Sequence, residues 1–563
     1  MQKQGEKCCK NLTIKIMQHY LSLLQNTVQE HWNDHALCNY KGETFTFGEF
    51  ATKLERFHIL FEKIGIQKGD KVALCAKNCA RWAVAFFASN TYETVTVPIL
   101  ADFTSDSIAS LVDHSDAKVF FVDEDKWAKL NHDAMPQLQL VISVDTFAPL
   151  YCANDEVKAA VDNLDAAFNE KWPAGYGKDD VKFPIENWDD LAIINYTSGT
   201  TSAPKGVMLP YASTCTNVVF GQSRIPTHFG YTLVSMLPLA HVYGLMFELI
   251  YPLCGGVCIY FLGKSPSPKI LLAAMAEVKP YSVMTVPLVM EKIFKSSVLP
   301  TLNKPAMKVL TKIPIINGVI FKKIHDKLIE AFGGKIDWII MGGAPLNPTV
   351  EYWFRKFKLP YTVGYGMTEA GPLMAYEDWR KFVPGSCGKG VDRCEVRIDS
   401  EDPQHVAGEI EARGMNLMVG YYKNEVATKA AFTEDGWMKT GDLGVIDADG
   451  NIFIRGRSKN MILSSNGQNI YPEEVEAVVN NQPYVVESVV VDRASKLVAL
   501  VYLDAEKIKA DGLDAEALSI KIEEMMALIN KKMPSYSKLT KIETVDQPFE
   551  KTPKMSIKRF LYK

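Results

Sequence analysis

The chain has 563 residues, too many for a single hydrophobic core, and its 47% hydrophobic content favours a globular protein of two or more domains. Lys and Arg total 62 against 66 Asp and Glu, a net charge of −4, which excludes the basic footprint of a nucleic-acid-binding protein. The eleven cysteines lack paired metal-ligand spacing, so we expect reduced thiols and a cytoplasmic location.

The first half of the chain alternates helix and strand signals. Thr46 and Glu49 form a capping box, and a helix is predicted from there to Gly65. Residues 71–76 (KVALCA) and 191–196 (LAIINY) are short apolar runs typical of buried strands. This alternation predicts an α/β fold, with a large N-terminal part built of α/β subdomains and mostly parallel sheets. The apolar positions of the predicted helix are Phe50, Leu54, Phe57, Phe61 and Ile64.

Two stretches bear on membrane insertion. Residues 231–262 are almost uncharged and long enough to span a bilayer, but Pro238, Pro252 and the Gly255-Gly256 pair divide them into pieces typical of a buried core. Residues 1–20 lack the sustained apolar core and the cleavage site of a signal peptide. We therefore expect no transmembrane segment.

The C-terminal pattern differs from the rest of the chain. Residues 484–504 predict two strands joined by a polar turn, and an amphipathic helix follows them. Together they predict a small α+β unit of about 100 residues. The polar, glycine-containing stretch 447–460 is the predicted junction with the larger part. Leu518, Ile522, Met525 and Ile529 share one face of the predicted helix.

Residues 196–206, YTSGTTSAPKG, place five hydroxyl side chains before a lysine. Those hydroxyls compete with the backbone for hydrogen bonds, which predicts a donor-rich loop suited to phosphate oxygens. The Walker A pattern fails, because Pro204 falls where its second glycine belongs and Gly206 follows Lys205. A solvent-exposed linker is the alternative interpretation of this loop.

Three further motifs carry groups that suit a nucleotide. MGGAPL (341–346) has small residues that permit a flat ligand to approach the backbone. GYGMTEAGP (364–372) supplies an aromatic ring, a hydroxyl and a carboxylate. WMKTGDLG (437–444) supplies Asp442, whose two oxygens can accept both hydroxyls of a ribose. GYGMTEAGP and WMKTGDLG alone are each equally compatible with an ordinary turn.

Taken together and in order, these motifs resemble the signatures of the acyl-adenylate-forming superfamily, and the resemblance spans nearly the whole chain. Within that superfamily the chain is most similar to bacterial long-chain fatty-acid–CoA ligases, especially in residues 456–476 and in the C-terminal tail. The motifs that carry the resemblance are YTSGTTSAPKGVML, PLAHVYG, GYGMTE, GEIEARG, TGDLG and GRSKNMILSSNGQNIYPEEVE.

The resemblance implies two half-reactions. A fatty acid, expected to be long-chain, attacks the α-phosphate of ATP to give an acyl-adenylate and pyrophosphate, and a CoA thiol then displaces AMP. Mg²⁺ is the implied cofactor, and ATP and CoA are the implied co-substrates. The resemblance also implies that a small mobile domain (459–563) rotates against a large domain (1–458) about a hinge near Lys459.

The resemblance further implies a role for individual residues. Thr200 and Glu369 would lie near Mg²⁺, and Thr368 would reach the α-phosphate. His241 would border the acyl and ATP pockets, although a lone histidine there is equally compatible with a buried core residue. The cradle for the β- and γ-phosphates would be Thr197, Ser198, Gly199, Thr200, Thr201 and Lys205. The remaining cofactor-binding positions would be Gly343, Ala344, Pro345, Tyr365 and Gly366 at adenine, Asp442 and Arg457 at ribose, and Gly467 at the CoA channel.

The tail departs from the family pattern K-T-x-x-G-K-x-x-R. Aligning KTPKMSIKR with it puts Lys551 and Arg559 in register but places Ser556 at the lysine that acts in adenylation. Either Lys554 or Lys558 substitutes for that lysine, or adenylation is slow. The departure motivates a rival hypothesis of a catalytically weak, ligand-binding relative. Another rival is an adenylate-forming enzyme for a different acid or a carrier-protein acceptor. Contact with the inner membrane surface is compatible with a lipid-handling enzyme.

Overall fold

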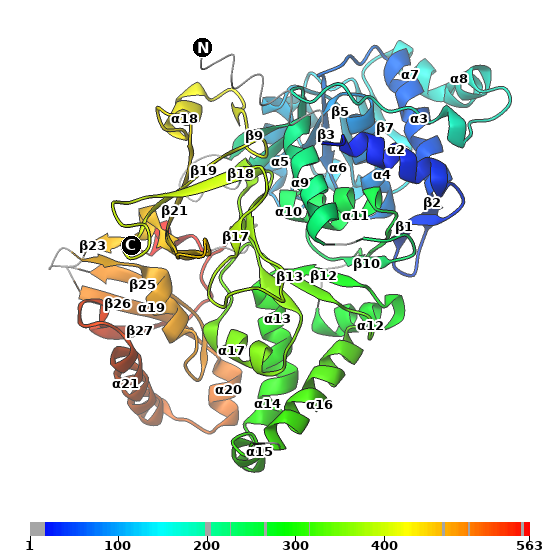
Figure 1. Cartoon of the computed structure of the whole chain (residues 1–563). Helices are drawn as coiled ribbons and strands as arrows, with labels where there is room; N and C mark the ends of the chain where they lie inside the picture. Colours follow the sequence, from blue (N-terminus) through cyan, green and yellow to red (C-terminus); the bar gives the residue numbers. More distant parts are fainter. Residues whose placement is uncertain are drawn as a thin grey trace.

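The computed structural model describes residues 17–197, 204–225, 227–263, 267–314, 316–463, 468–493, 496–552 and 557–562. Its largest sheet has eight strands in the order β20-β9-β8-β4-β3-β5-β6-β7 (Figure 1). The central pairs, from β8 to β6, are parallel, whereas β9, β20 and β7 are antiparallel additions at the edges. The strands are β3 (Lys71–Cys75), β4 (Val95–Pro98), β5 (Ala117–Val122), β6 (Leu140–Ser143), β7 (Pro149–Cys152), β8 (Leu191–Thr197), β9 (Lys205–Pro210) and β20 (Gly420–Tyr421).

Helices cover this sheet, and the best-predicted of them is α3 (Phe47–Lys63). Thr46 and Glu49 form the expected reciprocal capping box, and Gly65 follows the helix with a φ of +74°. Phe50, Leu54, Phe57 and Phe61 are buried as predicted. The other helices of this region include α2 (Tyr20–Glu30), α4 (Ala80–Thr91), α5 (Ser105–His114) and α9 (Tyr211–Arg224).

The uncharged segment 231–262 is divided as its prolines and glycines predict. It forms β10 (Thr232–Ser235), α10 (Val242–Gly244), the π-helical turn η3 (Leu245–Ile250), α11 (Tyr251–Cys254) and β11 (Cys258–Phe261). In the part of the chain that the structure describes, no helix is long and apolar enough to cross a membrane. Strands β10 and β11 join β1 (His35–Asn39) and β2 (Thr44–Thr46) in a four-stranded sheet.

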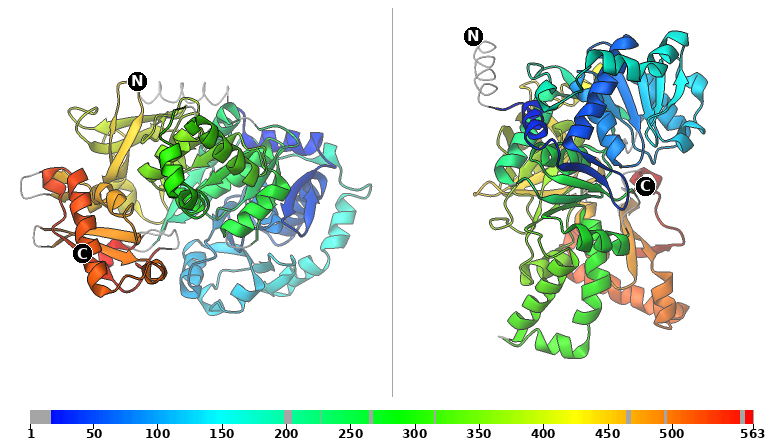
Figure 2. Two further views of the ribbon diagram at one scale, coloured as in Figure 1. Left: turned by 90° about the horizontal axis from the view of Figure 1, so that it is seen from below. Right: turned by 90° about the vertical axis from the view of Figure 1, so that its right-hand side faces the viewer.

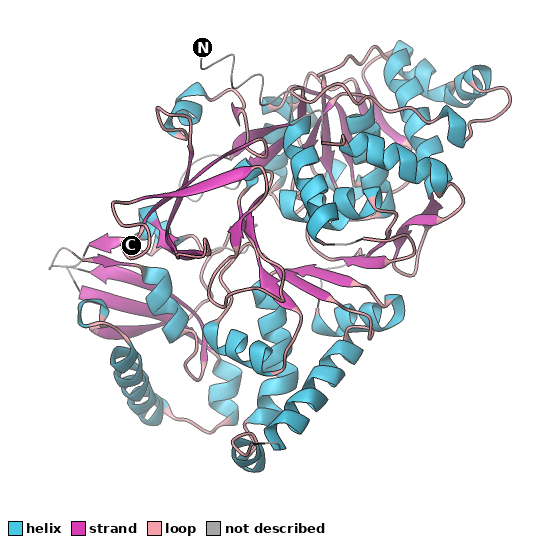
Figure 3. Ribbon diagram, viewed as in Figure 1, coloured by secondary structure: helices cyan, strands magenta, loops and turns pink. Residues whose placement is uncertain are grey.

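A small parallel sheet, β12-β13-β14, lies at the centre of the molecule (Figure 3). Its strands are β12 (Ser282–Thr285), β13 (Trp338–Met341) and β14 (Tyr361–Val363). Next in the chain come the short strands β15 (Tyr365–Gly366), β16 (Leu373–Tyr376) and β17 (Lys389–Gly390). An entirely antiparallel sheet follows, made of β18 (Cys394–Asp399), β19 (Gly408–Gly414), β21 (Met438–Ile446) and β22 (Ile452–Arg457).

The C-terminal unit is α+β, as predicted. Strands β25 (Val485–Arg493), β26 (Lys496–Leu503) and β27 (Lys541–Val545) form its sheet, which α19 (Pro472–Val479) and α21 (Ala515–Lys532) cover. Of the predicted helix face, Met525 and Ile529 are buried. Within the predicted junction 447–460, residues 452–457 form β22 and complete the antiparallel sheet, and the position of the junction stays a prediction.

The α/β fold class is confirmed, with one large α/β part and the small α+β unit. Figure 2 shows the unit, in orange and red, beside the antiparallel sheet. Arg455 on β22 reaches Glu474 on α19 at 3.4 Å, which ties the two parts together. The division at residue 458 and the rotation of the small unit stay predictions.

Candidate active site

The phosphate loop joins two antiparallel strands. Thr197 is the last residue of β8 and Lys205 the first of β9, and the two are register partners. The hairpin therefore holds both ends of the loop together at one edge of the large sheet. Of the loop's predicted residues, Ser198, Gly199, Thr200 and Thr201 lie outside the described residues.

Lys205 and Glu369 are brought together by a residue that the motifs did not single out, Tyr421. The Lys205 ammonium lies 4.9 Å from the centre of the Tyr421 ring, and the Tyr421 hydroxyl donates a 2.9 Å hydrogen bond to Glu369. Strand β20 pairs with β9, which places this ring beside the start of β9. A cation and a carboxylate thus flank one aromatic side chain, and a carboxylate is the kind of protein ligand that Mg²⁺ takes beside substrate phosphates.

The turn that carries Thr368 and Glu369 is tightly built. It is a short 3₁₀ helix, η5 (Thr368–Ala370), whose Glu369 carbonyl accepts a 2.8 Å hydrogen bond from the Met418 amide. Gly366 has no room for a side chain, because an added Cβ would lie 2.0 Å from the Pro372 carbonyl oxygen. This close approach explains why glycine follows Tyr365.

The glycine-rich segment and Tyr365 leave the same edge of the central sheet. Strands β13 and β14 are parallel neighbours, so the residues that follow Met341 and Val363 emerge side by side at their carboxyl ends. Gly343 has a φ of +84°, a left-handed conformation that glycine adopts without strain. Gly343, Ala344 and Pro345 are exposed, so their backbone is open to a ligand.

His241 lies between the strand that leads into the phosphate loop and the strand that leads into the glycine-rich segment. The Asn195 side chain on β8 donates a 2.8 Å hydrogen bond to the Ala240 carbonyl, which fixes His241 beside the strand that leads into the phosphate loop. On the other side, the Tyr243 hydroxyl donates a 3.0 Å hydrogen bond to the Ile340 carbonyl on β13. His241 is partly exposed.

Tyr365, Asp442 and Arg457 form one cluster. The Tyr365 hydroxyl donates to Oδ2 of Asp442 at 2.7 Å, and Nε of Arg457 lies 2.6 Å from Oδ1. Asp442 and Arg457 face each other as register partners on β21 and β22. Each carboxylate oxygen keeps a lone pair for a further donor, because a carboxylate offers about four acceptor sites.

Burial sets the electrostatics of this cluster. Burial raises the pKa of the Asp442 carboxyl, while the Arg457 charge and the Tyr365 hydrogen bond oppose that shift. Burial also raises the pKa of Tyr365 well above its ordinary value, so the phenol keeps its proton and acts as the donor. Asp442 is therefore a nearly buried hydrogen-bond acceptor, with Tyr365 at one carboxylate oxygen and Arg457 at the other.

The residues around Glu369 fit a magnesium ion. Mg²⁺ usually takes one or two carboxylates together with substrate phosphates and water, so a single partly exposed glutamate beside a phosphate loop suffices. Within the described ranges, no group of three or more His, Cys, Asp or Glu side chains could hold a metal by itself. Thr200, the other predicted ligand, lies outside those ranges.

The predicted hinge residue follows this cluster closely in the chain. Lys459 is exposed on η6 (Ser458–Asn460), directly after β22, and Gly467 lies outside the described residues. In the tail, Lys551 pairs with Glu487 at 2.6 Å, and Lys558 pairs with Glu550 at 3.2 Å. Lys554 and Ser556 also lie outside the described residues.

Two residues of the site escaped the sequence analysis for different reasons. Tyr421 follows Gly420 in a stretch that carries no catalytic pattern, and only the pairing of β20 with β9 brings it to Lys205. Asn195 did leave a signal, since it is the single polar side chain within the apolar run 191–196. A buried amide of that kind needs a partner, and the structure supplies the Ala240 carbonyl.

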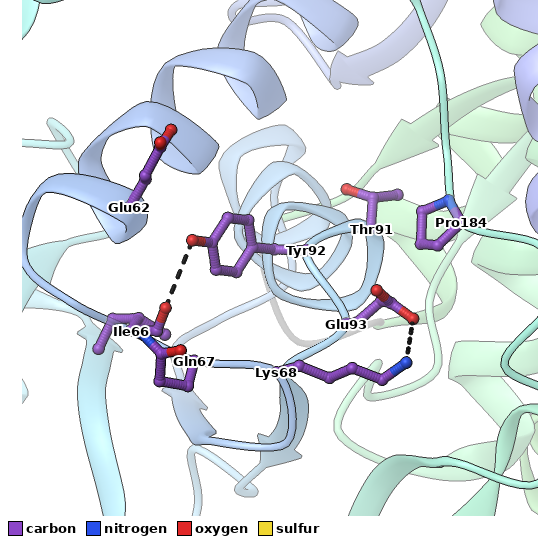
Figure 4. A pocket seen from close by; sticks show the side chains of 8 residues that line it. All are labelled: Glu62, Ile66, Gln67, Lys68, Thr91, Tyr92, Glu93 and Pro184. Carbon is purple, nitrogen blue, oxygen red and sulfur yellow. Dashed lines mark hydrogen bonds and ion pairs between the residues drawn. The ribbon is translucent and has the colours of Figure 1, made fainter.

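Figure 4 shows a separate cavity of about 490 Å³ near the end of α3. Lys68 in its lining is already paired, because its ammonium lies 2.7 Å from Glu93 and 2.9 Å from Asp190. None of the described residues that line it belongs to the sequence motifs. This cavity is therefore separate from the candidate active site that the motif residues form.

The comparisons with known proteins agree with the motifs. The sequence profile of the AMP-binding enzyme family matches residues 24–422, and that of the AMP-binding enzyme C-terminal domain matches residues 459–562. The chain is 28% identical to "Long-chain-fatty-acid--CoA ligase FadD15" of Mycobacterium bovis, over 82% of this chain and 77% of that protein. It is 26% identical to "4-coumarate--CoA ligase 1" of Petroselinum crispum, over 90% of this chain and 86% of that protein.

Solved structures share the fold at lower identity. ATP-bound MatB from Rhodopseudomonas palustris is 23% identical, with a TM-score of 0.74 over 97% of this chain and 98% of that one. O-succinylbenzoate CoA synthetase from Bacillus subtilis, in complex with ATP and magnesium ion, has a TM-score of 0.71 at 22% identity, over 96% and 98% of the two chains. The match of the larger family profile covers well over half of the sequence. The chain belongs to the AMP-binding enzyme family, the acyl-adenylate-forming CoA ligases.

Proposed function

We propose that the protein activates a long-chain fatty acid with ATP and transfers the acyl group to CoA, releasing pyrophosphate and then AMP. The observation that carries the adenylation step is the contact of Tyr365 and Arg457 with the Asp442 carboxylate. This contact brings residues of the GYGMTE, TGDLG and GRSKN motifs together at one buried carboxylate, that of Asp442. Residues 240–243 contact both β8, through Asn195, and β13, through Tyr243, and so lie between the phosphate hairpin and the predicted adenine segment.

In this proposal Asp442 binds the ribose. Its oxygens accept the two hydroxyls, and its contacts with Tyr365 and Arg457 keep the carboxylate in one orientation. Adenine lies against the exposed backbone of Gly343, Ala344 and Pro345, with the Tyr365 ring beside it. Gly366 leaves the backbone close to the ligand.

The triphosphate lies across the hairpin between β8 and β9. Thr197 and Lys205 hold the two ends of the loop, and the Lys205 charge offsets that of the β- and γ-phosphates. Mg²⁺, when bound, supplies further neutralisation of the phosphate charge. Glu369 holds the ion, while Tyr421 keeps the Glu369 carboxylate in place.

The nucleophile of the first step needs no general base. A fatty-acid carboxyl is already ionised near neutral pH, so catalysis consists of positioning it and stabilising charge at the attacked phosphorus. His241 and Thr368 lie on the elements that border this point, and we assign them to that positioning. The second step begins after the small domain, residues 459–563, turns about Lys459 and brings the Gly467 segment to the CoA thiol.

The long-chain assignment rests on the relatives' names. FadD15 and "Long chain acyl-CoA synthetase 6, peroxisomal" of Arabidopsis thaliana are each 28% identical to this chain. Because 4-coumarate–CoA ligase 1 is 26% identical, the identity of the acid needs a direct test. We propose a cytoplasmic location with peripheral membrane contact.

The test is AMP release with ATP, Mg²⁺ and CoA across saturated fatty acids of increasing length, with 4-coumarate and malonate as comparison acids. Turnover that peaks at long chains is expected. Glu369→Gln, purified in parallel, shows whether a contaminating ligase contributes. A peak with an aromatic or dicarboxylic acid would overturn the substrate class but not the adenylation chemistry.

Two rival functions are separated by the same assay. If pyrophosphate exchange proceeds but CoA does not raise AMP release, the acceptor is a different thiol, such as carrier-protein phosphopantetheine. If wild type is inert with every acid while ATP still binds, the protein is a ligand-binding relative. Ser556 at the lysine position is the observation that keeps this second rival in view.

A further inference from the structure

A helical projection extends away from the rest of the large part of the molecule. It consists of α13 (Pro287–Ile293), η4 (Phe294–Val298), α14 (Leu299–Leu302), α15 (Pro305–Leu310) and α16 (Ile316–Ala331). In Figure 1 α14 and α16 run downward and α15 forms the far tip; the right-hand view of Figure 2 shows the same projection.

The projection has a stable inner side. On α16, Leu328 is buried, and the Phe321 ring packs edge-on against Trp353 and Phe357 at centroid distances of 6.1 and 5.7 Å. The opposite side of the helix, with Val319 and Lys323, is exposed. The outer face is therefore held in a fixed orientation by the inner one.

The charge of this projection is opposite to that of the whole chain. Residues 292–325 contain seven lysines and no Asp or Glu, although the chain carries a net charge of −4. The nearest acids are Glu291 and Asp326, at the two ends of that stretch. Within the described part of the chain, Lys304, Lys308 and Lys312 make no ion pair, so their charge is uncompensated.

Exposed apolar side chains lie among these lysines. Val309 is 61% exposed and Val319 67% exposed, and Ile313 and Ile316 are each 39% exposed. Isolated exposed apolar residues are common, but four at one basic tip are not explained by packing within the chain. We call residues 304–314 and 316–323 the basic tip.

We propose that the basic tip docks on a membrane surface that carries anionic lipid headgroups. Lysines beside apolar side chains match such a surface, because the lysines attract the headgroup charge and the apolar groups enter the headgroup boundary. A nucleic acid would use the lysines alone and leave Val309 and Val319 in water. The proposal extends beyond the ligase activity. Docking by the basic tip would hold the protein in one orientation on the membrane, where the fatty acid of the proposed function is found.

Sedimentation of the full chain with lipid vesicles tests this proposal. One set of vesicles is phosphatidylcholine, and the other mixes phosphatidylglycerol into it. We expect binding to the anionic vesicles alone, weakening as salt rises. Lys304→Gln/Lys308→Gln/Lys312→Gln is expected to reduce this binding about 100-fold. Val309→Ser/Val319→Ser is expected to reduce it with little change in salt dependence.

A matched control removes three exposed lysines from the small unit, as Lys509→Gln/Lys531→Gln/Lys532→Gln. This variant should bind vesicles like wild type, and thermal unfolding shows that all variants are folded. Equal loss in the control, equal binding to neutral vesicles, or retention of binding in both tip variants would overturn the proposal. So would tighter binding to duplex DNA than to anionic vesicles. Because the assay contains no ATP, a failure here leaves the proposed ligase function untouched.

Discussion

The Tyr365 hydroxyl lies 2.7 Å from Oδ2 of Asp442, although the two residues come from separate sheets. Tyr365 belongs to a short strand after the parallel sheet, and Asp442 belongs to the antiparallel sheet. Their hydrogen bond therefore joins the two layers at the proposed ribose site. A change at either residue should affect nucleotide binding before it affects the acid or CoA.

Asp442→Ala is expected to lower kcat/KM for ATP about 100-fold, because it removes the acceptor of both ribose hydroxyls. Tyr365→Phe should lower it only about fivefold, since one hydrogen bond to a retained carboxylate is lost. ATP-dependent pyrophosphate exchange measures both effects. Tyr376→Phe is the matched control, because the Tyr376 hydroxyl is buried without a partner among the described residues. An unchanged KM for ATP in Tyr365→Phe would contradict the assignment.

Tyr421→Phe is expected to raise the Mg²⁺ concentration needed for half-maximal activity about fivefold, because Glu369 loses its hydrogen-bond donor. The phenylalanine ring still lies under the Lys205 ammonium. Tyr421→Leu removes that ring as well and should also raise the KM for ATP. Tyr422→Phe, which loses a hydrogen bond to Asp116 elsewhere, should leave the Mg²⁺ titration unchanged. Identical titrations for Tyr421→Phe and wild type would count against Glu369 as the metal ligand.

The pH dependence of stability should reveal the buried carboxyl of Glu248. Its Oε2 accepts hydrogen bonds from Ser235 Oγ and from the amides of Met236 and Leu237, at 2.9–3.0 Å. Burial raises the pKa of Glu248 well above 4.5, so the folded state keeps a proton that the unfolded chain releases. The stabilisation is complete below pH 4.5 and is lost as the pH rises toward the folded-state pKa.

In that window the contribution falls by about 1.4 kcal/mol per pH unit. Glu248→Gln keeps the acceptor oxygen but cannot ionise, so its free energy of unfolding should fall less steeply with pH than that of wild type. Urea unfolding at a series of pH values measures the difference, and the exposed Glu434→Gln serves as control. Parallel curves for wild type and Glu248→Gln would show that Glu248 is ionised in the folded protein.

Local features of this fold could be predicted, whereas contacts between distant motifs could not. The capping box of Thr46 and Glu49 and the strand at 191–197 depend on neighbouring residues, so the sequence pattern suffices. The position of Tyr421 depends on the pairing of β20 with β9, which no local pattern encodes. The strand within 447–460 was missed for the same reason, because those residues look like a polar linker until β21 supplies the partner strand.

Lys459→Pro is expected to slow thioester formation at least about 100-fold while leaving adenylation near the wild-type rate. Proline fixes φ near −65° and restricts the preceding residue, so the backbone after β22 loses the freedom that a rotation requires. Adenylation is measured by pyrophosphate exchange, and the second step by thioester formation from added acyl-adenylate and CoA. Lys459→Ala keeps that freedom and should support both steps. Equal loss of both steps in Lys459→Pro would place the hinge elsewhere.

Ser556→Lys is expected to accelerate adenylation at least about tenfold and to leave thioester formation from added acyl-adenylate unchanged. The register of the tail is set by Lys551, which pairs with Glu487 at 2.6 Å, and by Arg559, which pairs with Glu476. Lys558 pairs with Glu550 on the same tail at 3.2 Å, so it must leave a partner before it can reach a phosphate. Lys554→Ala and Lys558→Ala, measured in the wild-type background, show which lysine acts now. If Ser556→Lys adds nothing and one alanine variant abolishes pyrophosphate exchange, that lysine already performs the role, and the family pattern has shifted along the tail.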